Sequence, residues 1–470
     1  GLKGSDLYDA WLGCSQENDA AHCLNVLAKT GIESASWLVV DHYGLDIRWE
    51  KQLLSGLSGT GEAPRLLVID DLANRVHQAD ILLDQNYFGE ATHQRYQDLV
   101  PVQCRQLLGP YYALLGPEYA LLHPLIPPRN ELRRVLVFFG GVDSDNLTGR
   151  TLEALMDPAF VDLAVDVVLG VQSTHRKKIE ELVIRRPNTT LHDPLPSLAG
   201  LISRADLAIG AGGATIWERA CFGLPSLVVV SAVNQLPVVK ALDLDRHLQF
   251  LDYGASVTAQ QICRALHDKI AEKSGDGIPT SLTDGWGASR LAMAMLGQQG
   301  PIRLRPIKAS DEALLLSWAN DPQVRANSFE SEQIAPADHH YWFQKGFADP
   351  NRLLLIATTK DGCPIGQIRF DLQHTTDHLH SCEAALDISI DRCARGLGLS
   401  VHLVRLGLQA MERRWGFGVD VVADVLLTNT ASNTCFERAG FRAKPKSGSS
   451  YAPSNLPFKR WLWRGPILNE

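Results

Sequence analysis

The sequence contains no C-x-x-C pair, although it has nine cysteines. An odd number of scattered cysteines predicts reduced thiols, and argues against a disulfide framework or a zinc site. Long hydrophobic runs are also missing, since the longest, such as PSLVVVSAV, have the length of a buried strand and are too short to span a membrane. Together with the lack of a signal peptide, these absences favour a cytoplasmic protein.

An excess of positive charge is missing as well. The formal net charge is -8 and no basic block occurs, which argues against a protein that binds nucleic acid. The fractions of hydrophobic residues (45%) and charged residues (21%) are typical of a globular protein. Because 470 residues exceed one ordinary hydrophobic core, we expect two to four domains.

Short β-branched runs alternate with helix-like segments in the first part of the chain. Most are continuous apolar runs, which is typical of strands buried on both faces of a parallel sheet. A segment rich in Pro, Gly and Tyr, 107–131, indicates a change of domain. We therefore expect two open α/β domains, 1–125 and 126–298, facing a common cleft. The expected strands are 36–43, 65–71, 79–85, 133–141, 165–170, 189–193, 205–213 and 225–230.

A different pattern begins after the loop-like segment 275–290, a short helix LAMAML and the linker GQQGP. IRLRPI alternates like an edge strand, and three further runs indicate an antiparallel meander. A helix, the strand VDVVADVLL and a second helix follow. This pattern predicts a separate α+β domain over 301–470, with the meander formed by 353–359, 364–373 and 383–391.

The stretch IGAGGATIWE (209–218) places three glycines between an expected strand and an expected helix. Glycines at such a turn let backbone N–H groups approach a diphosphate, while Thr215 can donate to a phosphate and Glu218 can accept from a ribose diol. The stretch lacks G-x-G-x-x-G and the Walker pattern. A tight strand–helix turn with a solvated Glu218 explains the residues equally well.

Other glycine and polar residues are expected at the same sheet edge. Gly140 and Gly141 end the first strand of the second domain, and Asn234 and Gln235 follow the strand PSLVVV. An ordinary polar loop is the alternative interpretation of Asn234 and Gln235. In the first domain, expected strands end at Asp41-His42-Tyr43, Asp70-Asp71 and Asp84-Gln85-Asn86, where α/β enzymes place catalytic groups. His42 is a candidate base, although a histidine at a strand end is more often structural.

These segments carry a resemblance. VVDHYGLDIRWE, LLVIDDLANRVHQADILLDQN, LLGPYYALL, VLVFFGGVDSDN and IGAGGATIWERACFGLPSLVVV…NQ resemble the UDP-2,4-diacetamido-2,4,6-trideoxy-altropyranose hydrolases of pseudaminic acid biosynthesis, over residues 5–298. The resemblance implies a glycosyltransferase-B-like pair of Rossmann-type domains without an evident metal. It implies UDP at Gly212, Gly213, Thr215 and Glu218, and catalytic roles for Tyr43 and Asn234; we add Gly140, Gly141 and Gln235 to the expected UDP site.

One feature of that family is missing from the sequence. The family opens with a strand and a G-x-G-H turn, whose histidine is taken as the base for water, and no such motif precedes residue 36. His22 lies in a helical stretch without the glycines and is not a candidate. We therefore expect either that the first strand and helix of the domain are missing from the chain or that hydrolysis is impaired, because losing a general base costs about 10²–10⁴-fold in rate.

A second glycine-containing turn, DRCARGLGLS (391–400), precedes a helix in the last domain. It resembles the R-x-x-G-x-G/A turn of GNAT-superfamily N-acetyltransferases, and TNTASNTCFERAGF (428–441) resembles the closing motif of that superfamily. A plain helix entry is the alternative for the turn alone. The resemblance implies that acetyl-CoA binds at Arg395, Gly396, Gly398, Ser400 and Asn429, with Arg392 beside them. It also implies that Phe436 occupies the place of the tyrosine that protonates the leaving thiolate.

Candidates for the acceptor side of the acetyltransferase are less specific. Glu383, Asp387 and Asp391 have even spacing, so on a regular strand they share one face and can steer or deprotonate an ammonium group. Solvated strand charges are the alternative. His339, His340 and Trp342 are expected in an acceptor loop or in a packed loop with exposed histidines.

Both resemblances point to one pathway. We expect a bifunctional enzyme that acetylates the 4-amino group of a UDP-linked amino sugar with acetyl-CoA and then hydrolyses the UDP–sugar bond at C1, with neither nucleic acid nor membrane as a partner. Two alternatives stay open: a UDP-sugar glycosyltransferase, and a non-catalytic UDP-sugar-binding module attached to an active acetyltransferase.

Overall fold

The structure of the chain is a computed structural model that divides into two compact units, Gly1–Leu291 (unit 1) and Ala292–Glu470 (unit 2). The residues that it describes are 8, 10–30, 35–57, 63–271, 281–296, 302–347, 349–374, 382–416, 418–444 and 456–464.

Unit 1 begins with a parallel four-stranded sheet in the order β1-β2-β3-β4. Helices α2 (Gln16–Lys29) and α3 (Ile47–Leu57) cover one face, and their apolar side chains share a core with the sheet that includes Trp49, Leu53 and Leu66. Ser15 caps α2 by accepting from the N–H of Asn18. The strands are β1 (Trp37–Val40), β2 (Arg65–Ile69), β3 (Ile81–Asp84) and β4 (Arg105–Leu108).

The second sheet of unit 1 has six parallel strands in the order β10-β9-β8-β5-β6-β7. Read from β7, this is the Rossmann order, in which β5 and β8 lie side by side at the point where the order reverses. Ligands of such sheets bind outside the carboxyl ends of the strands at this point. The strands are β5 (Arg134–Phe138), β6 (Ala164–Val168), β7 (Thr189–His192), β8 (Leu207–Ala211), β9 (Ser226–Val230) and β10 (Gln249–Tyr253).

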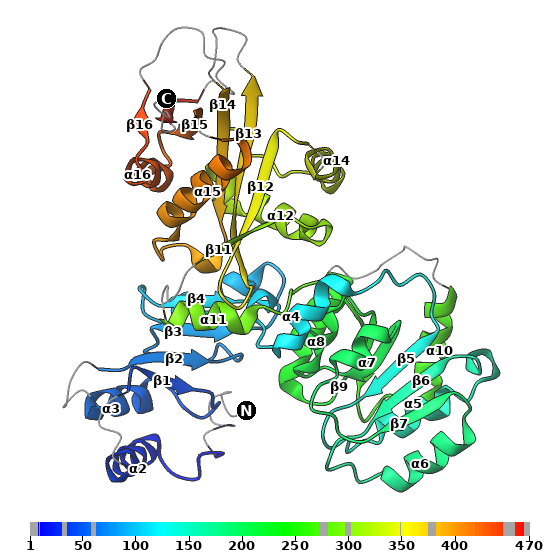
Figure 1. Ribbon diagram of the computed structural model, residues 1–470. Helices are drawn as coiled ribbons and strands as arrows, with labels where there is room; N and C mark the ends of the chain where they lie inside the picture. Colours follow the sequence, from blue (N-terminus) through cyan, green and yellow to red (C-terminus); the bar gives the residue numbers. More distant parts are fainter. Residues whose placement is uncertain are drawn as a thin grey trace. The chain divides into compact units, whose positions relative to one another are not determined.

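Helices cover both faces of this second sheet, as Figure 1 shows. Helices α5, α6 and α10 pack on one face over a core that contains Phe160, Ile179 and Ile262. On the other face, α4, α7, α8 and α9 enclose two further apolar clusters. The helices of unit 1 that follow α3 are α4 (Pro117–Leu122), α5 (Leu147–Ala154), α6 (Arg176–Arg185), α7 (Ala199–Arg204), α8 (Thr215–Cys221), α9 (Leu236–Leu244), α10 (Ala259–Ala271) and α11 (Gly287–Leu296), of which α11 lies beside β3 and β4 of the first sheet (Figure 1); the 3-10 turns are η2 (Ala91–His93), η3 (Pro110–Tyr112), η4 (His123–Leu125), η5 (Pro158–Phe160) and η6 (Val233–Gln235).

Unit 2 is built on a seven-stranded sheet in the order β11-β12-β13-β14-β15-β17-β16. All neighbours are antiparallel except β14 and β15, which are parallel. Helices α12 and α14 lie on one side of the sheet, and α15 and α16 on the other (Figure 1). The elements are β11 (Arg303–Pro306), η7 (Ala309–Asp311), α12 (Glu312–Ala319), α13 (Pro322–Ala326), α14 (Pro336–Phe347), β12 (Arg352–Thr358), β13 (Pro364–His374), β14 (Cys382–Ile390), η8 (Arg392–Ala394), α15 (Leu399–Trp415), β15 (Val419–Leu426), α16 (Thr430–Arg438), β16 (Arg442–Ala443) and β17 (Phe458–Trp463).

The structure confirms the expected mixed α/β architecture with parallel sheets, and every strand expected from the sequence is present. Burial on both faces is confirmed for β3, β8 and β9, whereas β1 is an edge strand whose Val39 is 51% exposed. Strands β4, β10, β16 and β17 were not expected. Part of the expected loop 275–290 lies outside the described residues, and its end is already helical in α11. The pairing of two glycosyltransferase-B domains stays a prediction.

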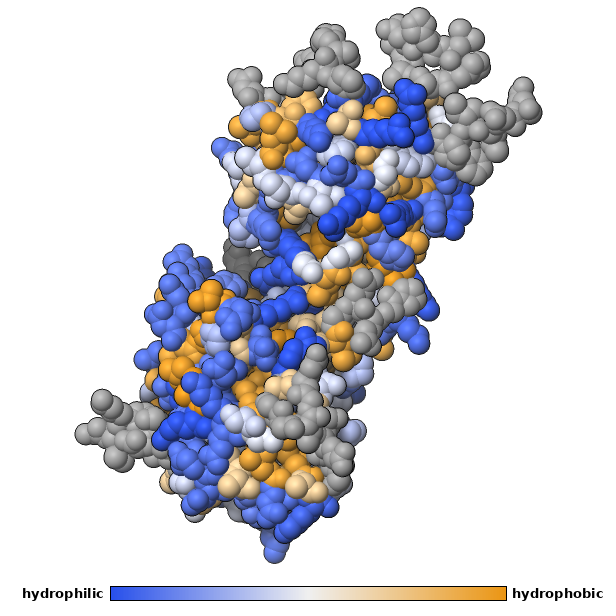
Figure 2. Space-filling view, turned by 90° about the vertical axis from the view of Figure 1, so that its left-hand side faces the viewer, coloured by the Kyte–Doolittle hydropathy of each residue, from blue (hydrophilic) through white to orange (hydrophobic). Residues whose placement is uncertain are grey.

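The surface carries hydrophobic residues in patches that hydrophilic residues interrupt (Figure 2). Among the described residues, no helix combines the length and the hydropathy that crossing a membrane requires.

Candidate functional site

Unit 2 has a cavity of about 350 Å³ at the place where two parallel strands separate. Strands β14 and β15 pair only from Cys382 with Val419 to Ala385 with Val422. Beyond these pairs, residues 386–390 of β14 and 423–425 of β15 line opposite sides of the cavity. The gap leaves backbone N–H and C=O groups of β14 available to an extended ligand.

The residues expected to bind acetyl-CoA meet at this cavity. Gly396 and Gly398 have positive φ angles of 77° and 72°, in the left-handed region that favours glycine. A Cβ atom on either glycine would have no heavy atom within 4 Å, so the loop is open to a ligand. Gly398 is the N-cap of α15, whose first turn contains Ser400. The five expected residues Arg395, Gly396, Gly398, Ser400 and Asn429 all line the cavity.

Two of these side chains already have partners. Arg395 forms an ion pair with Asp321 at 2.9 Å and donates to Gln323 Oε1 at 2.9 Å and to the Ile390 carbonyl at 3.0 Å. Asn429 caps α16, because its Oδ1 accepts from the N–H of Ser432 at 3.1 Å. Arg395 therefore fixes the loop to α13, and the open backbone of the loop is the part that faces a ligand.

The structure separates the three carboxylates expected on one strand face. Asp387 lines the cavity and is half exposed, with Gln367 Nε2 donating to it at 2.9 Å and Arg369 Nη2 lying 3.8 Å from it. Glu383 lies 3.7 Å from Lys444. Asp391 follows the last residue of β14 and is buried, where it accepts from Trp318 Nε1 at 2.6 Å. Asp387 is therefore the carboxylate of the three that can meet an acceptor amine.

The other expected acceptor residues lie on a helix. His339, His340 and Trp342 belong to α14, so the expected loop is wrong. His339 is buried beside Phe343, and neither ring nitrogen has a partner within the described structure. Burial lowers the pKa of His339, and nearby His340 lowers it further. Phe436 lines the cavity and offers no proton, as its identity implies.

Unit 1 has a second cavity, of about 300 Å³, between the carboxyl ends of its two sheets. The β1 end contributes Tyr43, and the segment after β9 contributes Asn234 and Gln235. Gly212 and Gly213 face them from the β8–α8 turn. Five of the nine residues expected in this site therefore line one cavity.

Tyr43 is held by a carboxylate of the same cavity. Its hydroxyl donates to Asp71 Oδ2 at 3.0 Å, and Asn86 Nδ2 donates to the same oxygen at 3.3 Å. Asp71 Oδ1 is buried and has no hydrogen-bond partner among the described residues. Burial raises the pKa of Asp71, and nearby Asp70 raises it further. Burial and Asp71 also raise the pKa of Tyr43.

Four expected UDP-binding residues do not line this cavity. Glu218 accepts from the Tyr119 hydroxyl at 2.8 Å, and its pKa is raised by burial. Thr215 lines a pocket of about 10 Å³ under α8. Gly140 and Gly141 follow β5, and the Gly141 carbonyl accepts from the N–H of Gln172. The structure thus brings together the glycines of β8 and the amides after β9, and leaves the ribose-binding role of Glu218 a prediction.

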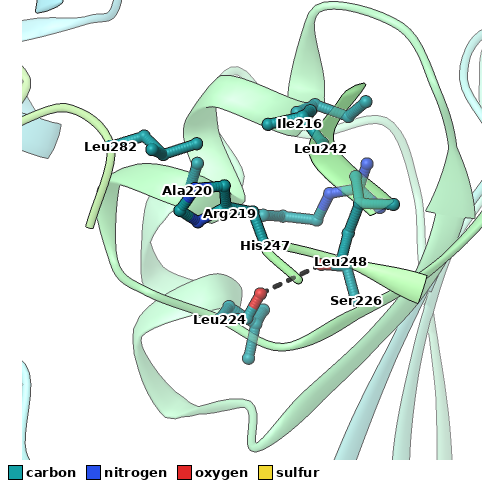
Figure 3. A pocket seen from close by; sticks show the side chains of 9 residues that line it. All are labelled: Ile216, Arg219, Ala220, Leu224, Ser226, Leu242, His247, Leu248 and Leu282. Carbon is teal, nitrogen blue, oxygen red and sulfur yellow. Dashed lines mark hydrogen bonds between the residues drawn. The ribbon is translucent and has the colours of Figure 1, made fainter. Parts of the chain in front are cut away.

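Sequence reasoning missed Arg219. Its side chain is buried and donates to the carbonyl of Ala211 at 2.7 Å and of Thr215 at 3.3 Å, which fixes the β8–α8 turn from below. Burial lowers the pKa of Arg219 to about 10. Figure 3 shows it crossing a pocket of about 20 Å³, enough for one water molecule. An arginine after a glycine turn looks like a surface residue, so no signal in the sequence revealed it.

Comparison with known families identifies unit 2. The model of the acetyltransferase (GNAT) domain matches residues 302–442. Unit 2 contains a GNAT acetyltransferase domain. This match agrees with the expected acetyl-CoA cosubstrate.

Curated relatives are matched over part of their length. The spore coat polysaccharide biosynthesis protein SpsG of Bacillus subtilis (strain 168) is 30% identical over 130 residues, 27% of this chain and 36% of the relative. An uncharacterized protein of Methanocaldococcus jannaschii is 25% identical over 223 residues, 45% of this chain and 43% of the relative. The chain therefore spans less than half the length of these relatives.

Solved structures resemble about a third of the chain. A spermidine N-acetyltransferase from Vibrio cholerae, solved with CoA and spermine, is 15% identical with a TM-score of 0.30, and covers 34% of this chain and 94% of that chain. An aminoglycoside acetyltransferase in complex with coenzyme A and kanamycin is 19% identical with a TM-score of 0.30, and covers 35% of this chain and 95% of that chain.

Proposed function

We propose that the chain is a bifunctional nucleotide-sugar enzyme. The GNAT domain transfers an acetyl group to the amine of a UDP-linked amino sugar, and unit 1 hydrolyses the UDP–sugar bond. The observation that carries the first activity is the meeting of five expected cofactor residues, from two separate motifs, at one cavity. The printed name of the relative from Bacillus subtilis, which refers to polysaccharide biosynthesis, supports a sugar substrate.

The residues around the unit 2 cavity fit acetyl-CoA. Bound acetyl-CoA supplies an acetyl group activated as a thioester. The open loop at Gly396 and Gly398 directs backbone N–H groups at a pyrophosphate, as helix N-termini do. Asp387, at the cavity wall, attracts an ammonium group and accepts its proton, so that the neutral amine can attack.

In unit 1 we assign the proton-accepting role to Asp71. Water attacks C1 of the sugar, the bond from C1 to the diphosphate oxygen breaks, and Asp71 takes the proton of the water. Three observations support Asp71: it lines the cavity opposite Gly212 and Gly213, its Oδ1 has no partner in the described part of the chain, and Tyr43 and Asn86 fix its Oδ2. A raised pKa makes its carboxylate a stronger base.

Both activities are tested with one substrate. The full chain is given a UDP-linked 4-amino sugar and acetyl-CoA, and acetylated UDP-sugar and free UDP are followed separately. We expect acetylated UDP-sugar first and free UDP afterwards. Failure of a folded protein to form the acetylated sugar removes the sugar-amine assignment, and UDP binding without UDP release leaves unit 1 a binding module.

Two controls sharpen this test. Release of UDP in the absence of any organic acceptor excludes a glycosyltransferase. Asp387→Asn should slow acetyl transfer, whereas Glu383→Gln, on the same strand but not among the residues that line the cavity, should not. Equal rates for the two variants would remove Asp387 from the reaction.

A further inference from the structure

Asp157, Cys263 and His267 bring three different metal-binding side chains together outside both cavities. Asp157 is the N-cap of η5, and Cys263 and His267 lie one turn apart on α10. Their donor atoms all lie within 4.8 Å of one another, and no second group of three such donors occurs in the part of the chain that the structure describes. Neither proposed activity uses these residues.

The separations match those between ligands of a shared metal ion. His267 Nε2 lies 3.5 Å from Asp157 Oδ2, which is longer than an N–H···O hydrogen bond. The Cys263 thiol donates to the same oxygen over 3.6 Å, and the ion would take the place of its proton. Two ligands of a tetrahedral zinc ion, at metal distances of about 2.0–2.3 Å, lie roughly 3.3–3.6 Å apart. Two of the three separations therefore match those between zinc ligands, and the third, between Cys263 and His267, is within 4.8 Å.

Two of the three side chains are already oriented. Asp157 Oδ1 accepts from the N–H of Ala159 at 2.9 Å, which leaves Oδ2 facing α10. The His267 ring packs against the buried ring of Phe160, with centroids 4.7 Å apart. Partners that fix ligand orientation in this way are a regular part of metal sites.

We propose that Asp157, Cys263 and His267 bind a zinc ion that links η5 to α10. A mixed set of sulfur, nitrogen and oxygen donors selects zinc over magnesium and calcium, which take oxygen ligands. Cys263 binds as the thiolate and releases its proton to solvent, and water takes the fourth position. This site revises the expectation that the cysteines hold no metal: its ligands lie 106 residues apart, which no short motif reveals.

The full chain, freed of metal with a chelator, is titrated with Co²⁺ and then with Zn²⁺. We expect one Co²⁺ per chain with a thiolate-to-cobalt charge-transfer band, displacement of Co²⁺ by Zn²⁺, and a rise in the melting temperature of unit 1. Cys263→Ser should abolish the charge-transfer band. His267→Ala should weaken Co²⁺ binding by about 10–100-fold or more, since the loss of a residue that only supports a metal ligand already has an effect of this size.

Cys23→Ser is the matched control. Cys23 Sγ lies 3.6 Å from Asp19 Oδ2, the same contact as in the proposed site, but this pair belongs to no group of three donors among the described residues. The control variant should bind Co²⁺ like the parent. Binding that lacks the charge-transfer band, that survives Cys263→Ser and His267→Ala, or that Cys23→Ser removes would overturn the proposal. If Cys263→Ser does not fold, His267→Ala still tests the site, because the His267 side chain is half exposed and its removal should leave the fold intact.

Discussion

The two glycine turns look alike in the sequence and differ in the structure. In the GNAT domain, Gly396 and Gly398 have positive φ angles and open space where a side chain would be. In unit 1, Gly212 does not have a positive φ angle, and a Cβ atom there would lie 2.8 Å from Val239 Cγ2 on α9. The first turn needs glycine for its backbone conformation, whereas the second needs it because a helix packs closely.

This difference explains how well each site was predicted. A loop shaped by its own backbone brings its residues to one place, and the four expected acetyl-CoA residues of this turn line one cavity together with Asn429 of the second motif. A turn whose shape is set by packing against a neighbouring helix directs its residues toward different surroundings. Accordingly, Gly212 and Gly213 face the unit 1 cavity, Thr215 faces a small pocket under the helix, and Glu218 pairs with Tyr119. A glycine turn alone therefore does not indicate a ligand.

The largest expected effect is a loss of UDP release from unit 1 that leaves acetyl transfer by unit 2 intact. Asp71→Asn should lower the rate of UDP release by about 10²–10⁴-fold, since the variant cannot accept the proton of water. Acetyl transfer by the GNAT domain should keep its rate. Calorimetry should show UDP binding close to that of the parent, and a variant that releases UDP at the parent rate would remove Asp71 from the mechanism.

Gly212→Ala tests the packing interpretation of the unit 1 turn. The added methyl group meets Val239, which is fully buried, so the free energy of unfolding of unit 1 should fall by about 1–3 kcal/mol. Val239→Ala alone should also destabilise, because it leaves a cavity, but Gly212→Ala should cost less in that background, since the smaller residue makes room for the methyl group. Denaturant unfolding measures both, and no change on Gly212→Ala would contradict close packing.

Gly398→Ala tests the backbone interpretation of the GNAT turn. There is room for the methyl group, but the left-handed conformation costs about 1–2 kcal/mol for a residue other than glycine. If the loop relaxes to avoid this cost, the dissociation constant for acetyl-CoA should rise by roughly tenfold. Gly213→Ala is the control in the other turn, since its Cβ atom would meet only Gln235 Nε2 at 3.6 Å, and its affinity for acetyl-CoA should match the parent.

The smallest expected effect is a pH dependence confined to unit 2. The folded state lowers the pKa of His339 below the ordinary 6.5, so the unfolded chain takes up the proton first as pH falls. The melting transition that acetyl-CoA raises should therefore move to lower temperature below about pH 6.5. His339→Leu should flatten this dependence, whereas His340→Gln, which removes only the smaller cause of the lowered pKa, should reduce it slightly.

Most of the fold could be predicted because its strands are continuous apolar runs. Strand β4 escaped because RQLL has only two apolar residues, and β10 because QFLDY mixes polar and aromatic residues at a sheet edge. Strand β17 is the antiparallel neighbour of β15, and in its sequence FKRWLW polar and apolar residues do not alternate regularly. Edge and polar strands are specified by their partners, which a single sequence does not show.

The sequence predicted which residues meet at one cavity where these residues follow a strand of a parallel sheet. Tyr43 follows β1 of the first sheet and Asn234 follows β9 of the second, and the carboxyl ends of both parallel sheets face one cavity. The separation of Asp387 from Asp391 was not predictable, since it depends on β14 ending at Ile390. Arg219 was missed because an arginine after a glycine turn looks exposed, and the Asp157–Cys263–His267 group because Asp157 lies 106 residues from Cys263 in the sequence.

The last helix of unit 1 limits where the chain can be cut. Arg290 is fully buried, forms two hydrogen bonds with Asp284 and reaches the Tyr111 carbonyl at 2.9 Å. Gly285 and Gly287 touch the backbone of residues 113 and 120 so closely that neither could carry a side chain without displacing it. A fragment that stops before Arg290 would leave Asp284 without its charge partner, at a cost of about 3–5 kcal/mol. A gene fragment for unit 1 should therefore include the codons for the whole first turn of α11, even though that helix continues into unit 2.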